Sequence, residues 1–466
     1  MSQENSTRGA SGGATTRPIS THTPEGATAN VMHARKVERI ADQLRRRKST
    51  APLSRQKRTV SHQVPKVRDK KYSDEKVNLL DFDEIIEVDP ERRICIAEPG
   101  VPFCKVVDRT LPLGFVPIVV PELKTITIGG AVAGCSIESM SYRYGGFHDT
   151  CLEYEIITAK GDVLTCTPEN EHALIFQMMH GSFGTVGILS RLVFKLVPAK
   201  QFVHLRHETH RSIDSYLESI WSHYEKQDVH FMDGIIHSLD QLVLCVGDFV
   251  DSAPYTNRYD WLKVYYQSTA ERKEDYLRTP HYFYRYDQGV TNVHPKSFLG
   301  RLLFGKFLGS SEILRIAEKL RWFFLNDDRP DVTVDTFLPF SKLKEFLIWY
   351  EKDFGHFPLW CVPYRRVHDY EWLVDDFWKG MKDELMVDIA IYGMKQIGDT
   401  NYYRLMEEKL KELNGVKTLI SYNYYPEEEF WTIFNRQNFE AVKAITDPNN
   451  IFRNLYEKTC QASMGK

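Results

Sequence analysis

The residues most suited to chemistry are closely spaced glycines in the stretch TITIGGAVAGCSIES, which begins at Thr125. Gly129, Gly130 and Gly134 all lie within it. Because glycine lacks Cβ, it accepts positive φ and lets a ligand approach the main chain. Exposed N–H groups in such a turn attract anions, and a following helix N-terminus adds to the effect. We expect this segment to bind a pyrophosphate; the alternative is an ordinary tight turn between strands.

A second glycine-rich stretch has the spacing G-x-x-G-x-x-G, from Gly181 through Gly184 to Gly187. Neither stretch matches the G-x-G-x-x-G fingerprint of Rossmann domains, and the sequence has no Walker A loop. If these glycines bind a nucleotide, they do so within a different architecture.

The composition argues against several classes of protein. A formal net charge of -3 indicates no nucleic-acid partner. The eight cysteines are scattered and form no C-x-x-C pair, so we expect reduced thiols and no metal site. No run of about 18 apolar residues occurs, so we expect no transmembrane helix and a cytoplasmic location.

The elements that must position the glycines predict an α+β protein. Its 466 residues suggest two or three domains. Residues 1–31 are rich in Ser, Thr, Gly and Ala and are expected to be a disordered tail. Residues 32–200 alternate short strands with helices, starting with a helix in HARKVERIADQLRRRK and a hairpin in EIIEVD and RICIAEPG. After Lys200 we expect a sheet covered by helices, among them Ser212–Lys226, Glu312–Leu325 and Ser341–Phe354.

The order of these motifs resembles a known group of flavoproteins. The stretches PELKTITIGGAVAGCSIESMSYRYGGFHD, EYEIITAKGDVLTCTPEN and GSFGTVGILSRLVFKLVPAK are similar to the FAD-binding domain of the vanillyl-alcohol-oxidase / p-cresol-methylhydroxylase (PCMH) class. More narrowly, the sequence resembles the delta-24 sterol reductase family. That resemblance continues in HFMDGIIHSLD, ELMVDIAIYG and EEEFWTIF, and it covers most of the sequence from about residue 35.

The resemblance implies a domain plan. Residues 32–200 would form the PCMH-type FAD-binding domain, built from two α/β subdomains. Residues 201–440 would form an α+β substrate domain that caps the flavin. Residues 441–466 would return toward the FAD-binding domain.

The resemblance also implies a cofactor site. FAD is expected to be non-covalent; attachment through His148 or Cys135 is the less favoured alternative. Glu138 would accept from a ribose hydroxyl or cap the turn by accepting main-chain N–H groups. The implied cofactor-binding residues are Thr127, Ile128, Gly129, Gly130, Ala131, Val132, Ala133, Gly134, Cys135, Ser136, Ile137, Glu138, Ser139, Tyr144, Gly145, Gly184 and Gly187.

The sequence departs from the class at one place. A first, glycine-rich phosphate loop is expected upstream, but the matching stretch, STAPLSRQKRTVSHQV, contains no glycine. Two explanations stay open. The charged side chains of Arg55, Lys57 and Arg58 replace the main-chain donors, or the site has decayed and the protein is a non-enzymatic binder.

The chemistry implied by the family is reduction of a double bond in the side chain of a sterol, with NADPH as a transient reductant of the flavin. An isolated alkene carries no carbonyl, so hydride addition needs a proton donor at the other alkene carbon. An FAD-dependent alcohol or sugar oxidase or dehydrogenase is the rival within the same fold. For each candidate, a purely structural hydrogen-bonding role is the alternative. The candidate donors and positioning groups are Arg285, Asp388, Tyr392, Tyr422 and Asn423.

An aromatic stretch bears on how a sterol-like substrate would reach the protein. YEWLVDDFWKGM places Trp372, Leu373, Phe377 and Trp378 within seven residues. One hypothesis is an exposed lip that contacts a membrane, such as that of the endoplasmic reticulum, or a partner. The alternative, which is more common for aromatic clusters, is a buried core helix.

Overall fold

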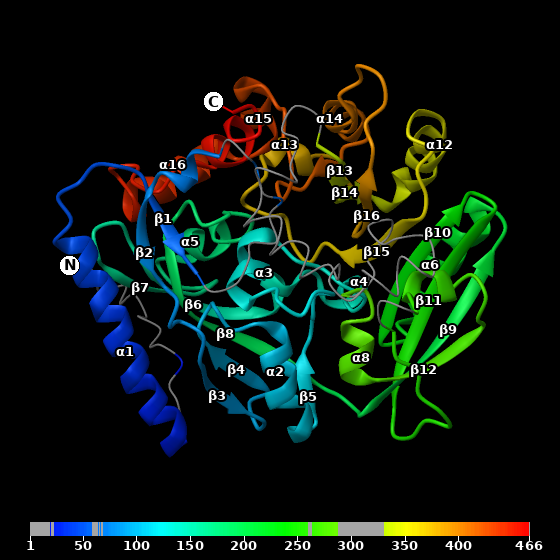
Figure 1. Cartoon of the computed structure of the whole chain (residues 1–466), viewed down its shortest axis with the longest axis horizontal. Coiled ribbons are helices and arrows are strands. Elements are labelled where there is room, and N and C mark those ends of the chain that lie inside the picture. The colour runs from blue at the N-terminus through cyan, green and yellow to red at the C-terminus, as the bar shows by residue number, and fades with distance from the viewer. Residues whose placement is uncertain are drawn as a thin grey trace, which may run out of the picture.

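The structure is a computed structural model, which describes residues 23–57, 69–259, 263–287 and 330–465, together with residues 19, 64 and 66. The helix expected at Glu312–Leu325 lies outside the described residues. Figure 1 shows two bodies, each made of a sheet with its helices, which lie side by side.

The first helix begins earlier than the sequence indicated. Helix α1 spans Pro24–Arg45, so an unstructured tail reaching residue 31 is wrong for residues 24–31. Thr23 caps this helix by accepting from Gly26 N, and proline at the first helical position adds to the start signal. The predicted apolar face is confirmed by its buried side chains, Val37, Ile40, Ala41 and Leu44.

A six-stranded sheet forms the first body, in the order β3-β4-β8-β6-β7, with β5 also paired to β8. The central strand β8 pairs antiparallel with β4 and β6 on its two edges, and nearly all of its side chains are buried. The predicted hairpin is confirmed by the antiparallel pairing of β3 with β4. The bounds are β3 Ile85–Asp89, β4 Ile94–Ala97, β5 Phe115–Pro117, β6 Cys151–Ile157, β7 Val163–Cys166 and β8 Ile188–Pro198.

Short helices and a separate strand pair complete this body. Strands β1 (Leu53–Gln56) and β2 (Glu75–Asn78) pair in parallel and stand apart from the larger sheet. The helices are α2 Phe103–Thr110, α3 Ile128–Gly134, α4 Ser141–Tyr144 and α5 Ala173–Met178. The glycine-rich stretch that opened the sequence analysis therefore forms α3 and its surroundings.

A nine-stranded sheet forms the second body, which begins at Phe202, shortly after β8 ends at Pro198. Its order is β12-β9-β11-β10-β15-β16-β14-β17, with β13 paired to β16. The strands are β9 Phe202–His210, β10 Phe231–Ser238, β11 Gln241–Val250, β12 Glu274–Arg278, β13 Val332–Val334, β14 Thr336–Pro339, β15 Leu359–Arg365, β16 Leu385–Met394 and β17 Val416–Lys417.

The helices of the second body include two that the sequence predicted. Helix α6 (Ile213–Lys226) and helix α12 (Leu343–Asp353) confirm two of the expected segments. The other described α-helices before residue 427 are α7 Tyr265–Ser268, α8 Thr279–Phe283, α13 Asp375–Trp378 and α14 Tyr402–Glu412. Together these elements make a mixed helix-and-sheet protein.

The C-terminal part of the protein packs back on the first body. Helices α15 (Glu427–Ile433) and α16 (Arg436–Thr446) precede a π-helical turn at Glu457–Gln461. In Figure 1 helix α16, in red, lies beside β1 and α5. Leu53 N donates to Ile451 O at 2.7 Å, which ties β1 to this end of the protein.

The aromatic stretch around Trp372 belongs to the interior. Trp372 and Leu373 are buried, and Phe377 and Trp378 pack against the same core. The exposed lip is therefore wrong for Trp372 and Leu373, and the core alternative fits. Among the described helices, none combines the length and apolar character needed to cross a bilayer.

Candidate functional site

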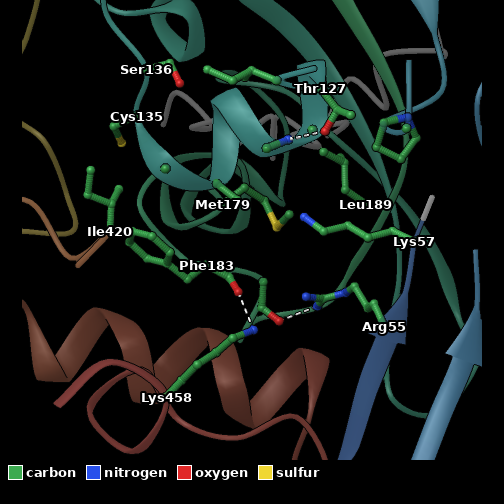
Figure 2. Close-up of a pocket in the computed structure, with 18 of the residues that line it drawn as sticks. Arg55, Lys57, Thr127, Cys135, Ser136, Met179, Phe183, Leu189, Ile420 and Lys458 are labelled. Atoms are coloured by element: carbon green, nitrogen blue, oxygen red, sulfur yellow. Dashed lines mark hydrogen bonds between the residues drawn. The ribbon is translucent and has the colours of Figure 1, made fainter. Parts of the chain in front are cut away.

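A cavity of about 850 Å³ runs between the two bodies. Its walls come from β1, from α3, from the G-x-x-G-x-x-G loop, from strands β15 and β16 of the second sheet, and from the C-terminal turn. Figure 2 looks into it, with α3 above and Arg55, Lys57 and Lys458 projecting from below and from the side. A cavity of this size is in the range of small-molecule and cofactor sites.

The main-chain donors at the start of α3 are already used within the protein. Gly129 N donates to Pro99 O at 3.0 Å, and Gly130 N donates to Thr127 Oγ1 at 3.2 Å. Ile128 N likewise donates to Val101 O. The expectation that the amides of Gly129 and Gly130 grip a diphosphate is therefore wrong in its mechanism, although both residues line the cavity.

The glycines of α3 are needed for two different reasons. A Cβ on Gly129 would stand 2.5 Å from Pro99 Cβ, so this glycine allows the helix to pack on the neighbouring main chain. A Cβ on Gly134 would meet no protein atom within 4 Å, although Gly134 also lines the cavity. Gly134 therefore leaves room for a ligand, whereas Gly129 is a packing residue.

The implied cofactor-binding residues separate into two groups. Ten of them line the cavity: Thr127, Gly129, Gly130, Ala133, Gly134, Cys135, Ser136, Ile137, Gly184 and Gly187. The other seven lie behind that surface: Ile128, Ala131, Val132, Glu138, Ser139, Tyr144 and Gly145.

Glu138 and Arg285 form a buried ionic centre behind the cavity wall. The carboxylate of Glu138 accepts from Ser139 N and Oγ, which is the turn-capping alternative. Arg285 Nη2 lies 3.1 Å from Glu138 Oε1 and 2.9 Å from Asp233 Oδ2. Burial lowers the pKa of Arg285, but the two carboxylates outweigh this and raise it well above its usual value. Arg285 is thus neutralised inside the protein and does not reach the cavity.

One end of the cavity is cationic. Arg55 donates to Gly184 O and, at 2.5 Å, to Gly187 O; Lys458 donates to Phe183 O at 2.6 Å. Lys57, Lys71 and Arg453 line the same region. Burial lowers the pKa of Arg55 to about 10. Burial, and then the nearby charge of Arg55, lower the pKa of Lys458 well below its ordinary value.

The other end of the cavity is acidic and aromatic. Glu122, Asp335, Asp388 and Tyr392 line it, beside Phe337 and Trp360 of the second sheet. Tyr392 Oη donates to Asp335 Oδ1 at 2.6 Å, and Asp388 Oδ1 accepts from Thr336 N at 2.6 Å.

Burial changes the protonation of the acidic end. It raises the pKa of Asp335 to about 6 and, with the repulsion of neighbouring carboxylates, that of Glu122 to about 8. Burial and the charge of Asp335 raise the pKa of Asp388 well above its usual range. The same two causes raise the pKa of Tyr392, so this phenol keeps its proton at neutral pH.

Two of the candidate catalytic residues lie away from the cavity. Asn423 Oδ1 accepts from Lys417 Nζ at 2.5 Å, and the main-chain oxygen of Tyr422 accepts from the same ammonium group. Lys417 is paired with Glu407 at 3.2 Å. This buried network supports the fold. Tyr422 and Asn423 therefore do not lie where the expected catalytic role would require.

The two positions considered for covalent attachment differ. Cys135 lines the cavity, where burial raises the pKa of its thiol well above the usual value. His148 does not line it: the ring packs against His180 and Tyr370 and lies 3.4 Å from Asp149. The described residues provide no group of His, Cys, Asp and Glu suited to a metal ion.

Comparison with known proteins shows which proteins this sequence is similar to. Residues 27–167 match the FAD binding domain family. The protein is 28% identical to the Delta(24)-sterol reductase of Homo sapiens over 427 residues, which cover 87% of this sequence and 81% of that protein. It is 22% identical to a Delta(24)-sterol reductase homolog of Caenorhabditis elegans, over 92% of this sequence and 88% of that protein. It is also 22% identical to the Delta(24)-sterol reductase of Arabidopsis thaliana, over 82% and 76%.

The protein is similar to Delta(24)-sterol reductases over most of its length, and its first part matches an FAD binding domain. The cavity suits FAD because the side chains that line it change in character along its length. Cationic groups line the end that would hold phosphates, a glycine helix lines the middle, and aromatic side chains line the other end.

Sequence reasoning missed three groups in the cavity. Asp335 lies in a run of strand-forming residues, VTVDTF, where an acid among apolar neighbours is the available signal. Glu122 stands between Pro121 and Leu123 and gave no such signal. Lys458 lies in an unremarkable charged turn, and only the return of the C-terminal segment across β1 brings it to the site.

Proposed function

We propose that the protein is an FAD-dependent reductase of a double bond in the side chain of a sterol, with NADPH as the reductant. The observation that carries the proposal is the cavity between the two bodies, which combines a cationic end with an acidic, aromatic end. The family supports the cofactor, and the names of its relatives support the substrate class. FAD, when bound, supplies the hydride chemistry.

Different residues of the cavity would bind different parts of the cofactor. Gly130, Gly134 and Ser136 of the α3 region would line the middle of the cofactor, and the cationic end would hold its phosphates. Trp360 and Phe337 would exclude water from the reacting end. We expect non-covalent binding, because His148 is packed away from the cavity and burial raises the pKa of the Cys135 thiol, which keeps it protonated and unreactive.

Tyr392 is the residue best placed to donate a proton to the alkene. Its hydroxyl lies at the acidic end of the cavity, remains protonated at neutral pH and is held by Asp335 at 2.6 Å. Burial raises the pKa values of Asp388 and Glu122. These carboxyl groups would return a proton to Tyr392 after each turnover. Asp335 would orient the tyrosine hydroxyl.

The finer domain plan is part of the same proposal. Residues 32–200 would be the PCMH-type domain, with the β1-β2 pair and the six-stranded sheet in its two subdomains. Residues 201–440 would cap the flavin, and residues 441–466 would return to the first domain. Access of a sterol-like substrate would involve peripheral contact with a membrane such as the endoplasmic reticulum.

The test is spectroscopic. Purified protein supplied with FAD is expected to show flavin absorbance that NADPH bleaches without oxygen and that a sterol with an unsaturated side chain restores. Bleaching by an alcohol or sugar instead would favour the oxidase or dehydrogenase of the same fold. A protein that stays colourless and unstabilised in excess FAD would overturn the proposal and favour a decayed site.

A further inference from the structure

The cationic end of the cavity has an imbalance of charge that the fold does not explain. Arg55 and Lys458 are distant in sequence but face the same cavity. Their hydrogen bonds go only to main-chain oxygens of the loop 183–187. Among the residues that the structure describes, neither has a carboxylate within 4.0 Å. Asp447 acts on Arg55 only at longer range.

Further positive groups surround this pair. Lys57 projects into the cavity beside Arg55 in Figure 2, and Lys71 lines the same region. Burial, and then the charges of Arg55, Lys71 and Lys57, disfavour the charged form of Lys458, whereas the charge of Asp69 favours it. Arg55 and Lys458 are half-buried, and charges partly removed from water are normally paired, because desolvation of an unpaired ion is costly.

Holding the loop does not require this charge. A carbonyl oxygen also accepts from a neutral donor such as glutamine or serine, and it has no net charge to balance an ammonium or a guanidinium. A bound ligand with two or more negative charges would balance them. The neighbouring amides of Gly129 and Gly130 are already engaged, so they cannot replace these side chains.

We propose that Arg55 and Lys458 form a two-cation clamp for a pyrophosphate group, the diphosphate of a dinucleotide cofactor. The inference rests on the proposed function and makes it more specific, since it places the phosphate contacts in side chains and not in a glycine loop. The C-terminal turn becomes part of the cofactor site. The first phosphate loop lacks glycines because side-chain donors have replaced its main-chain donors. The site itself is then not lost.

The experiment measures ligand affinity, not turnover. Apoprotein is titrated calorimetrically with FAD, with riboflavin and with inorganic pyrophosphate, for the wild type and for Lys458→Gln, Lys458→Arg and Lys379→Gln. Lys379 is a matched control because its side chain is 81% exposed on the surface. Thermal unfolding of each apoprotein checks that the fold is intact.

Lys458→Gln is expected to weaken FAD and pyrophosphate binding by about tenfold to a hundredfold, the loss of one charge-assisted hydrogen bond. Riboflavin affinity should stay unchanged, Lys458→Arg should retain most of the FAD affinity, and Lys379→Gln should match the wild type. The FAD affinity of Lys458→Gln should also depend less steeply on salt.

Two results would overturn the clamp: equal loss of FAD and riboflavin affinity, or FAD binding by Lys458→Gln as tight as in the wild type. The second result would leave the proposed function standing, because the wild type still binds FAD. Conversely, a wild type that binds pyrophosphate through Lys458 but does not bind FAD would keep the clamp and refute the flavoenzyme.

Discussion

Arg285 Nη2 donates to Asp233 Oδ2 across 2.9 Å, and both side chains are buried. Asp233 belongs to β10 of the second sheet, whereas the second acid partner of Arg285, Glu138, follows α3 in the first body. Trp360, which lines the cavity, donates to the same Asp233 oxygen. This relationship joins the glycine segment to the second sheet, so Arg285 positions the cavity walls and does not contact the substrate.

Replacement of Arg285 by glutamine is therefore expected to lower stability sharply. It would leave two buried carboxylates facing one another, and breaking a buried ion pair typically costs about 3–5 kcal/mol. Thermal or denaturant unfolding of the apoprotein measures the effect. Arg365→Gln, which removes a half-exposed partner of Glu384, is the control and should change little. Wild-type stability of Arg285→Gln would contradict the structural role.

Tyr392→Phe is expected to slow sterol reduction by about a hundredfold to ten-thousandfold, the usual contribution of a positioned acid. Bleaching of the flavin by NADPH should be unaffected, because that half-reaction needs no proton from Tyr392. Stopped-flow measurement of each half-reaction separates the two. Tyr276→Phe, a change at the edge strand β12, is the matched control. Equal slowing of both half-reactions would exclude Tyr392 as the donor.

Glu122 gives a pH dependence whose sign follows from its raised pKa of about 8. The folded protein holds this proton more tightly than the unfolded state, so the contribution to stability is complete below about pH 4.3. It is lost as pH rises through about 8. The neighbours that shape this pKa are Glu138, Asp335 and Arg285.

Glu122→Gln should remove that part of the pH dependence. Between pH 5 and 8 the melting temperature of the wild type should fall relative to that of the variant. Parallel curves for the two proteins across this range would show that Glu122 is ionised in the folded state.

Two glycines of α3 offer a matched comparison. Gly129→Ala should destabilise the apoprotein because its Cβ would collide with Pro99. Gly134→Ala should leave the apoprotein as stable or raise its stability by up to about 1 kcal/mol, since alanine favours a helix. It should nevertheless weaken FAD binding, because the added methyl group would occupy space beside the ligand. Equal FAD affinity of Gly134→Ala and wild type would show that the cofactor lies elsewhere.

The sequence predicted features that depend on local pattern, and it missed those that depend on distant contacts. The α1 face, the β3-β4 hairpin and helices α6 and α12 follow from apolar periodicity and capping residues. The glycine stretch was placed correctly at the cavity. Its mechanism was not, because the partner of the Gly129 amide, Pro99, belongs to a different loop.

The candidate site shows the same division. Asp388 and Tyr392 were proposed as proton donors or positioning groups from the expected cap domain, and both line the cavity. Tyr422 and Asn423 were proposed on the same ground but face a buried lysine. Only the three-dimensional structure distinguishes the pair that lines the cavity from the pair that does not. Lys458 could not be found at all, since no local pattern indicates that its turn crosses β1.

The return of the C-terminal turn to β1 has a consequence for how the protein matures. Arg55 and Lys458 lie far apart in the sequence, yet both face one cavity. Residues 27–167 share their core with later segments, including Phe439 and Cys460. A polypeptide that stops before Lys458 would therefore lose part of this core together with one wall of the cavity, and it is expected to be unstable and colourless.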